Sequence, residues 1–231
     1  MKNKITQRQF GMVSGISLVI MTIVAGMVMG GVYAPVFKMN SEQLIEVLPE
    51  MRAEFLWGSI GWGVILLCDL LVSWGLYRFY EPKNNRRAMV MGGLRFIYSL
   101  ILGIAIIELI RAQFIFDGKE VYTLLQSFQS IWQLGLIIFG FHLLYLAGLV
   151  CEKNTLQKGI GILLFAAGIG YVISNTADLF ITDYEQLRER VEVVFLLPMV
   201  FGEFGLAIWL IAKGGKKLLP GRNPAFSNST E

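Results

Sequence analysis

The chain has 231 residues, of which 55% are hydrophobic, and its formal net charge at pH 7 is only +3. Its mean hydropathy of +0.60 is typical of polytopic membrane proteins and excludes a soluble globule. The basic residues gather at the ends of apolar runs and form no groove-sized patch, so the sequence argues against nucleic-acid binding. The lipid bilayer is therefore the first expected partner.

Six apolar runs are long enough to cross a bilayer, which requires about 20 residues in a helix. They cover residues 11–33, 55–79, 88–112, 128–150, 159–180 and 191–212. We therefore expect an all-α bundle of six transmembrane helices in one membrane domain over residues 1–214. A basic and polar cytoplasmic tail is expected over residues 215–231. The first run is too long for the apolar core of a signal peptide, so we expect it to remain as the first helix.

Lysine and arginine are unequally distributed between the two ends of these runs. The N-terminus, the loops 80–87 and 151–158, the C-terminal tail and the adjoining helix ends at Arg78 and Lys213 together hold 13 basic residues against three acidic ones. The opposite side holds six basic residues against eleven acidic ones. Because basic residues are retained on the cytoplasmic side, we predict that both termini are cytoplasmic in a multi-pass protein of the cell membrane.

Four ionisable residues lie inside four different apolar runs, each seven to ten residues from its predicted cytoplasmic end. They are Asp69, Arg95, His142 and Glu203, and His142 is the chain's single histidine. An acidic residue or an arginine at the centre of a membrane helix costs about 2.5–3.5 kcal/mol even on insertion scales. At about 1.5 Å of rise per residue the four lie at one depth, which predicts a shared buried polar cluster.

The charges of this cluster do not balance, because Arg95 can neutralise only one of the two carboxylates. With His142 neutral, one negative charge is in excess, and a proton or a bound cation relieves it, as does a cationic His142. We therefore expect a site that binds or moves a small solute, ion or proton. In this hypothesis Asp69 and Glu203 titrate, Arg95 is a fixed counter-charge and His142 is a relay.

Two alternatives to this function stay open from the sequence. In the first, the protein is an intramembrane enzyme in which Asp69, His142 and Glu203 hold a metal ion, since carboxylates and imidazole suit Mn, Fe or Zn. In the second, it is a structural or partner-binding membrane protein whose polar cluster only fixes the helix register. The chain carries no catalytic or phosphate-binding motif, so an enzyme is the less favoured class and no cofactor is predicted.

A second set of polar residues lies in the predicted outer half of the fourth and fifth runs. It consists of Gln129, Gln133, Tyr171, Asn175 and Asp178. The last three follow i, i+4, i+7 spacing, which places them on one face of a helix. They are expected either to line a wet vestibule that leads to the cluster or to form an interhelical hydrogen-bond seam.

Weaker patterns add three expectations. Asp69 and His142 are each followed by two leucines and, six residues on, by a glycine, and Glu203 occupies the same place in the last run. This predicts three hairpins repeated about an axis along the membrane normal, unless the similarity is a coincidence among leucine-rich helices. Asn40 with Gln43 fits a capping box that opens a short interfacial helix. Glu108 and Arg111 are spaced to pair within one helix.

With these residues in place, the chain resembles a family of six-helix prokaryotic integral membrane proteins catalogued as domain of unknown function 4386. The resemblance covers residues 8–214. It rests on Cys68-Asp69-Leu70, Gly93-Leu94-Arg95, Gly140-Phe141-His142-Leu143 and Gly202-Glu203-Phe204-Gly205-Leu206-Ala207-Ile208-Trp209-Leu210. The family pattern places an acid, an arginine, a histidine and a glutamate at the four cluster positions. The resemblance implies a shared polar site but no activity, cofactor or substrate.

Overall fold

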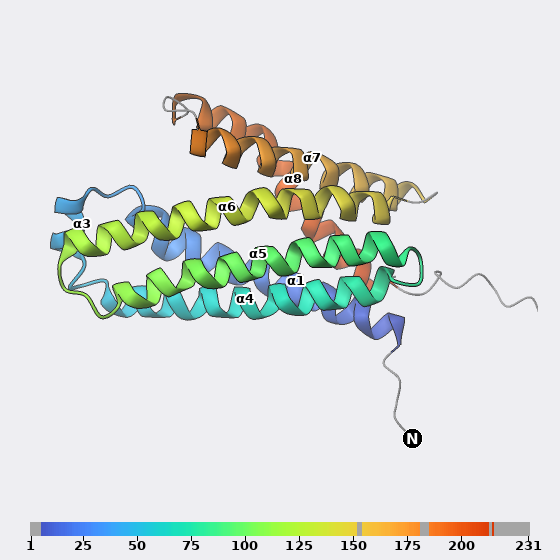
Figure 1. The fold of residues 1–231 in the computed structure, drawn as a ribbon, viewed down its shortest axis with the longest axis horizontal. Helices are drawn as coiled ribbons and strands as arrows, with labels where there is room; N and C mark the ends of the chain where they lie inside the picture. The colour runs from blue at the N-terminus through green and yellow to red at the C-terminus, as the bar shows by residue number, and fades with distance from the viewer. Residues whose placement is uncertain (1–5, 152–153, 181–184, 213, 215–231) are drawn as a thin grey trace, which may run out of the picture.

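A computed structural model describes residues 6–151, 154–180, 185–212 and 214, so the predicted tail over residues 215–231 lies outside the described part. Every regular element within these residues is helical (Figure 1). In chain order they are α1 Gln7–Val28, the π-helical turn η1 Met29–Tyr33, α2 Ala34–Val36, α3 Ser41–Val47, α4 Arg52–Tyr80, α5 Asn85–Ala112, α6 Gly118–Val150, α7 Thr155–Phe180 and α8 Glu185–Ala212. The all-α fold class is confirmed for this part of the chain.

Five segments are long and apolar enough to cross a membrane, and they correspond to the first five predicted runs. They are Gln7–Val36, Arg52–Tyr80, Asn85–Ala112, Gly118–Val150 and Thr155–Leu179. At the place of the sixth run, α8 contains a shorter apolar stretch, Leu197–Ala212. Helix α6 extends beyond its apolar run because a side-chain cap, and not hydropathy, marks where it begins. α6 starts at Gly118, where the Asp117 carboxylate accepts a hydrogen bond from the Lys119 amide at 2.9 Å.

The long helices pack as a closed ring in the order α1, α4, α5, α6, α7 and α8, and α8 returns to α1. Neighbours in the ring alternate in direction, so the start of α1 and the C-terminal ends of α4, α6 and α8 lie at one end of the bundle (Figure 1). We call this the inner end, and the end that carries α3 the outer end. Side chains from helices that are not neighbours in the ring can therefore meet in its interior.

Glycines permit the closest approach between ring neighbours. Gly140 of α6 and Gly168 of α7 face each other so closely that a Cβ atom on either would lie 2.8 Å from the carbonyl oxygen of the other. On α1, a Cβ atom at Gly15 would lie 2.8 Å from the carbonyl oxygen of Ala207 in α8. Small residues let membrane helices pack backbone to backbone, and these positions bring α6, α7, α8 and α1 near one another at the level of the predicted cluster.

The C-terminal end of α8 is held by a side chain from α1. The Arg8 guanidinium donates hydrogen bonds to the carbonyl oxygens of Leu210 at 2.7 Å, Gly214 at 2.9 Å and Ile211. Carbonyl groups in the last turn of a helix lack the full set of partners found in its interior, although Leu210 also accepts from the Gly214 amide at 3.2 Å. A cation near them also interacts favourably with the helix dipole. The same kind of contact occurs from Gln7 to Phe79 (2.7 Å), from Lys83 to Leu149 (2.6 Å), and from Arg52 to Gln113 (3.2 Å) and Ile115 (3.0 Å).

The outer half of the bundle is packed around aromatic rings. We call Tyr33, Phe37, Phe55, Trp62, Phe128 and Trp132 the outer aromatic cluster. The Trp62 ring centroid lies 5.0 Å from that of Trp132 and 5.1 Å from that of Phe128. The Tyr33 hydroxyl hydrogen-bonds the Ser59 hydroxyl at 3.0 Å. Aromatic side chains therefore link η1, α4 and α6 to one another at the outer end.

Helix α3 starts at the predicted capping box, and its apolar stripe faces the protein. Both hydrogen bonds of the Asn40–Gln43 capping box are present, at 2.8 and 3.1 Å. The apolar stripe behind it is buried in the protein, since Leu44 and Leu48 belong to the core. The apolar stripe of α3 therefore packs against protein, because α6 extends far enough at the outer end to contact it. The interfacial position of α3 stays a prediction.

Candidate functional site

The structure brings the side chains of Asp69, Arg95, His142 and Glu203 together; we call these four the inner cluster. They come from α4, α5, α6 and α8, respectively. Arg95 is central: its Nη2 donates to Asp69 Oδ1 at 2.5 Å, while its Nη1 lies 3.3 Å from His142 Nε2 and 4.0 Å from Glu203 Oε1. The side chains of Arg95 and Asp69 are each only 1% exposed. A short, charge-assisted hydrogen bond thus pairs Arg95 with Asp69, and Glu203 is left at the longer distance.

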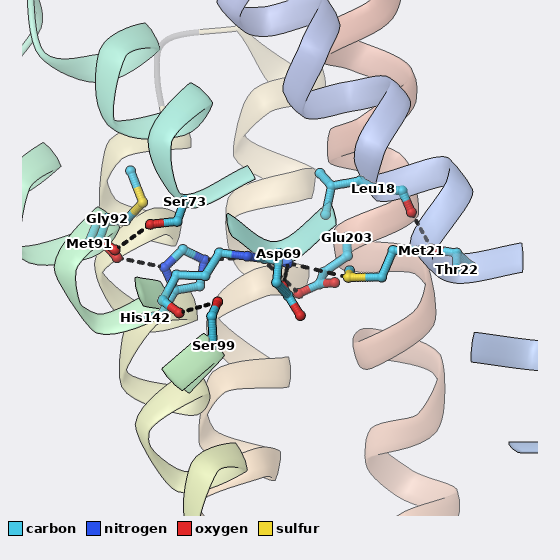
Figure 2. A network of polar contacts seen from close by, with 11 residues as sticks. Leu18, Met21, Thr22, Asp69, Ser73, Met91, Gly92, Ser99, His142 and Glu203 are labelled. Carbon is cyan, nitrogen blue, oxygen red and sulfur yellow. Dashed lines mark hydrogen bonds and ion pairs between the residues drawn. The ribbon is translucent and has the colours of Figure 1, made fainter. Parts of the chain in front are cut away.

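Arg95 also has two contacts that involve no carboxylate. Its Nη2 lies 3.7 Å from the sulfur of Met21, on α1, and its guanidinium carbon lies 5.1 Å from the centroid of the Phe139 ring, on α6. Figure 2 shows Met21 on the opposite side of the Asp69 and Glu203 carboxylates from His142. One guanidinium therefore contacts side chains from α1, α4, α6 and α8, and it joins both sides of the ring.

The partners of His142 decide its protonation and its tautomer. Its Nδ1 lies 2.8 Å from the Met91 carbonyl oxygen, which can only accept a hydrogen bond, so Nδ1 carries the proton. Its Nε2 faces Arg95 Nη1, which can only donate, so Nε2 presents its lone pair. The imidazole is consequently neutral in this arrangement. A second proton on Nε2 would place two donors and two positive charges against each other.

Two carboxylate oxygens of the inner cluster are buried without a hydrogen-bond partner among the described residues. They are Asp69 Oδ2 and Glu203 Oε1. Buried polar atoms are seldom left unpaired, and such an atom in a native structure requires an explanation. Glu203 is also the more accessible carboxylate, with 14% of its side chain exposed. Glu203 is therefore the group at which the cluster has both an unused acceptor and a degree of access.

The arrangement does not resemble a ready-made metal site. Within the described residues, no group of three His, Cys, Asp or Glu side chains is placed to hold one metal ion. Arg95 lies between the three residues that the enzyme alternative requires, and it is bonded to Asp69 and directed at His142. A metal ion held by Asp69, His142 and Glu203 would have to displace this guanidinium.

The outer polar residues are only partly connected. Gln133 of α6 donates a hydrogen bond through Nε2 to Asp178 Oδ2 of α7, whereas the Asn175 side chain bonds to the Tyr171 carbonyl of its own helix at 2.8 Å. Tyr171 instead packs its ring against Phe139, with centroids 5.3 Å apart. Gln129 is half-buried on α6. The structure thus brings Gln133 and Asp178 together and places Tyr171 beside the inner cluster.

Three participants were not predicted from the sequence. Met21 and the Met91 carbonyl have no sequence signal, since one is an ordinary apolar residue and the other a backbone group. Phe139 lies three residues before His142 on the same helical face, and its ring is 5.5 Å from the imidazole. That spacing is a signal that could have identified it.

Away from the cluster, Glu108 and Arg111 form the predicted ion pair at 2.8 Å. Asp69, His142 and Glu203 come from α4, α6 and α8, which are alternate members of the ring. Such an arrangement suits three repeated hairpins, and the repeat stays a prediction. Cys68 is buried, Cys151 is exposed, and both are free thiols.

Comparison with known proteins gives a family but no activity. The sequence model of a family described as "Domain of unknown function (DUF4386)" matches residues 13–214, a range that contains all four residues of the inner cluster. An uncharacterized protein of Archaeoglobus fulgidus is 31% identical over 161 residues, which are 70% of this chain and 86% of that protein. No solved structure matches the chain significantly.

Proposed function

Because the chain belongs to the DUF4386 family, whose description names no activity, we propose a function from the geometry of the inner cluster. The protein binds, and by this means moves, a proton or a small cation at Glu203. The observation that carries this proposal is the unequal pairing of the two carboxylates. Asp69 is bonded to Arg95 at 2.5 Å, whereas Glu203 lies 4.0 Å away with a buried oxygen that has no hydrogen-bond partner among the described residues.

Charge counting supports Glu203 as the binding group. Arg95 contributes one positive charge, and two ionised carboxylates contribute two negative ones. The neutral imidazole of His142 offers no compensation, because Arg95 occupies the position that a second imidazole proton would need. One negative charge is therefore in excess in a region of low dielectric, where an unpaired charge is costly. A proton or a cation at Glu203 restores neutrality.

This assignment divides the roles within the cluster. Arg95 is the fixed counter-charge of Asp69, and His142 holds the guanidinium through its lone pair. Glu203 is the exchanging group. The relay function expected for His142 from the sequence has less support than its role as an acceptor, since both ring nitrogens already have partners. Gln133 and Asp178 are proposed to begin the route from the outer end.

The proposal includes the membrane topology. We propose six transmembrane helices, with α8 as the sixth, and both termini on the cytoplasmic side of the cell membrane. The inner end would then face the cytoplasm, in agreement with the excess of basic residues in the segments that lie there. A reporter fused after Lys217 should be active only as a cytoplasmic fusion, and one inserted at Lys119 only as an external one. The reverse result at either position would reject this topology.

The decisive experiment compares Glu203→Gln with the matched variant Glu108→Gln, which changes a glutamate of the surface ion pair in α5. Purified proteins are titrated while infrared difference spectra record carboxyl protonation, and liposomes with an internal pH-sensitive dye record proton flux. The wild type and Glu108→Gln should both show a buried carboxyl that exchanges its proton, and both should carry flux. Glu203→Gln should fold normally and lose both signals, because an amide does not titrate.

The competing account is a polar cluster that only holds the helices together. It predicts that Glu203→Gln retains the wild-type infrared changes and has the same flux as the wild type. If sodium or potassium instead shifts the wild-type infrared signal but has no effect on the spectrum of Glu203→Gln, the bound species is a cation in place of a proton. A Glu203→Gln protein that behaves like the wild type under all these conditions would reject the proposed function.

A further inference from the structure

Phe139 is the residue on which the surroundings of the inner cluster converge. Its ring centroid lies 4.9 Å from that of Tyr98, 5.3 Å from that of Tyr171 and 5.5 Å from that of His142. The guanidinium carbon of Arg95 is 5.1 Å from the same ring. Phe139 itself is buried. One phenyl ring thus fills the interior between α5, α6 and α7 on the outer side of the charges.

Tyr98, Phe139 and Tyr171 form a layer between two groups of polar residues, the inner cluster and the Gln133–Asp178 pair. On α6, Phe139 lies three residues outward of His142 and six residues inward of Gln133, or about 4.5 Å and about 9 Å at the rise of an α-helix. On α7, Tyr171 lies seven residues inward of Asp178, about 10 Å by the same measure. Gln133 and Asp178 are bonded to each other at the outer level. The rings of Tyr98, Phe139 and Tyr171 lie between that pair and the inner cluster.

We propose that Phe139 is the barrier that separates the inner cluster from the outer polar pair and that its side chain determines what reaches Glu203 from the outer end. This inference rests on the proposed function, because it assumes that Glu203 exchanges a proton or a cation. It adds a residue that selects by size and hydration. A hydrated ion or an organic solute cannot pass a ring held on two sides by tyrosines. A proton is passed on by hydroxyl groups or by a single transient water molecule.

The identity of the residue fits this role. A phenyl ring presents an apolar obstacle to water and, at the same time, a negative face to the guanidinium of Arg95. An aliphatic side chain of similar size would exclude water without attracting the cation. A polar side chain would attract water into the path. Excluding water also strengthens the Arg95–Asp69 pair, because the interaction of two charges increases as the local dielectric falls.

The test uses a thiol placed in the cluster itself. In a chain with Cys68→Ala and Cys151→Ser, the substitution Glu203→Cys creates a single reporter. It leaves Arg95 and Asp69 as a neutral pair, so the protein should fold. A membrane-impermeant, positively charged thiol reagent is added from the outer side, and the rate of modification is measured. The variants are Phe139→Ala, Phe139→Leu and, as a matched control, Phe141→Ala, which removes a 43% exposed ring two residues away.

With Phe139 present, the reporter should be modified from the outer side no faster than a chain without cysteine. Phe139→Ala should raise the rate toward that of the exposed Cys151 thiol measured from the inner side in the wild type. Phe139→Leu and Phe141→Ala should not raise it. Equal protection in Phe139→Ala and Phe141→Ala, or free modification with Phe139 intact, would overturn the barrier. Because Glu203 is absent from this assay, its outcome is independent of whether Glu203 carries the proposed function.

Discussion

The inner cluster and the outer aromatic cluster both join helices that are distant in the sequence, but they do so by different interactions. In the inner cluster one guanidinium has direct contacts with Asp69 and His142 and a longer one with Glu203, and each contact depends on charge and direction. In the outer cluster, rings such as Trp62 and Phe128 meet edge to face at 5.1 Å and depend on shape. The first region is sensitive to the loss of its positive charge, whereas the second is sensitive to the loss of volume.

This difference follows from the bilayer as a solvent. Lipid tails are as apolar as leucine, so helices gain little from hydrophobic contact and associate through packing and polar bonds. The outer cluster provides packing. The inner cluster provides polar bonds, and it places two carboxyl groups beside one guanidinium, which packing alone would not require. A region that carries such groups for no gain in packing is where function is to be sought.

The largest effect should come from Arg95→Leu. It leaves Asp69 and Glu203 buried without a counter-charge, and breaking a buried pair in this way costs about 3–5 kcal/mol of unfolding free energy. Unfolding in detergent, followed by loss of helical circular dichroism, measures the change. Arg111→Leu, which breaks an exposed pair with Glu108, should cost about 1 kcal/mol or less. Equal stability of the two variants would mean that the residues of the inner cluster are uncharged or are reached by water.

Trp62→Ala should have a smaller effect on stability and none on the charged site. Removing a buried tryptophan costs about 3 kcal/mol or somewhat more through the cavity that remains. Tyr33→Phe, which deletes only the hydroxyl bonded to Ser59, should cost about 1 kcal/mol. In both proteins the infrared signal of Glu203 should match that of the wild type. A signal altered by Trp62→Ala would show that the two clusters are coupled, contrary to the division drawn above.

The sequence was sufficient for the position of the inner cluster because its members are conspicuous. An ionisable residue inside an apolar run is costly. Four such residues at a common distance from the same end of their helices are therefore expected to contact one another and not lipid. The helices themselves were predictable because the length and hydropathy of the apolar runs indicate where they lie. Helix starts were less predictable, because a single cap such as Asp117 begins α6 ten residues before its apolar run.

The details that decide the chemistry were not accessible from the sequence. Whether Arg95 pairs with Asp69 or Glu203 depends on the angular positions of α4 and α8 around the ring. The tautomer of His142 depends on the Met91 carbonyl, a backbone group that any residue would supply. The burial of the α3 stripe was not predictable for a related reason, since an apolar stripe fits protein and lipid equally well.

The contact of Arg8 with the end of α8 has a consequence for the order of assembly. The ring cannot close until the last helix has been synthesised, because α8 is the neighbour of α1. Until then the growing chain contains Arg95 and Asp69 as a balanced pair, with His142 neutral. Domains acquire structure from the N-terminus during synthesis, so the first five helices can associate without an uncompensated charge. Glu203 enters with the helix that completes the ring, so the second carboxyl group reaches Arg95 only when the surrounding bundle is ready to enclose it.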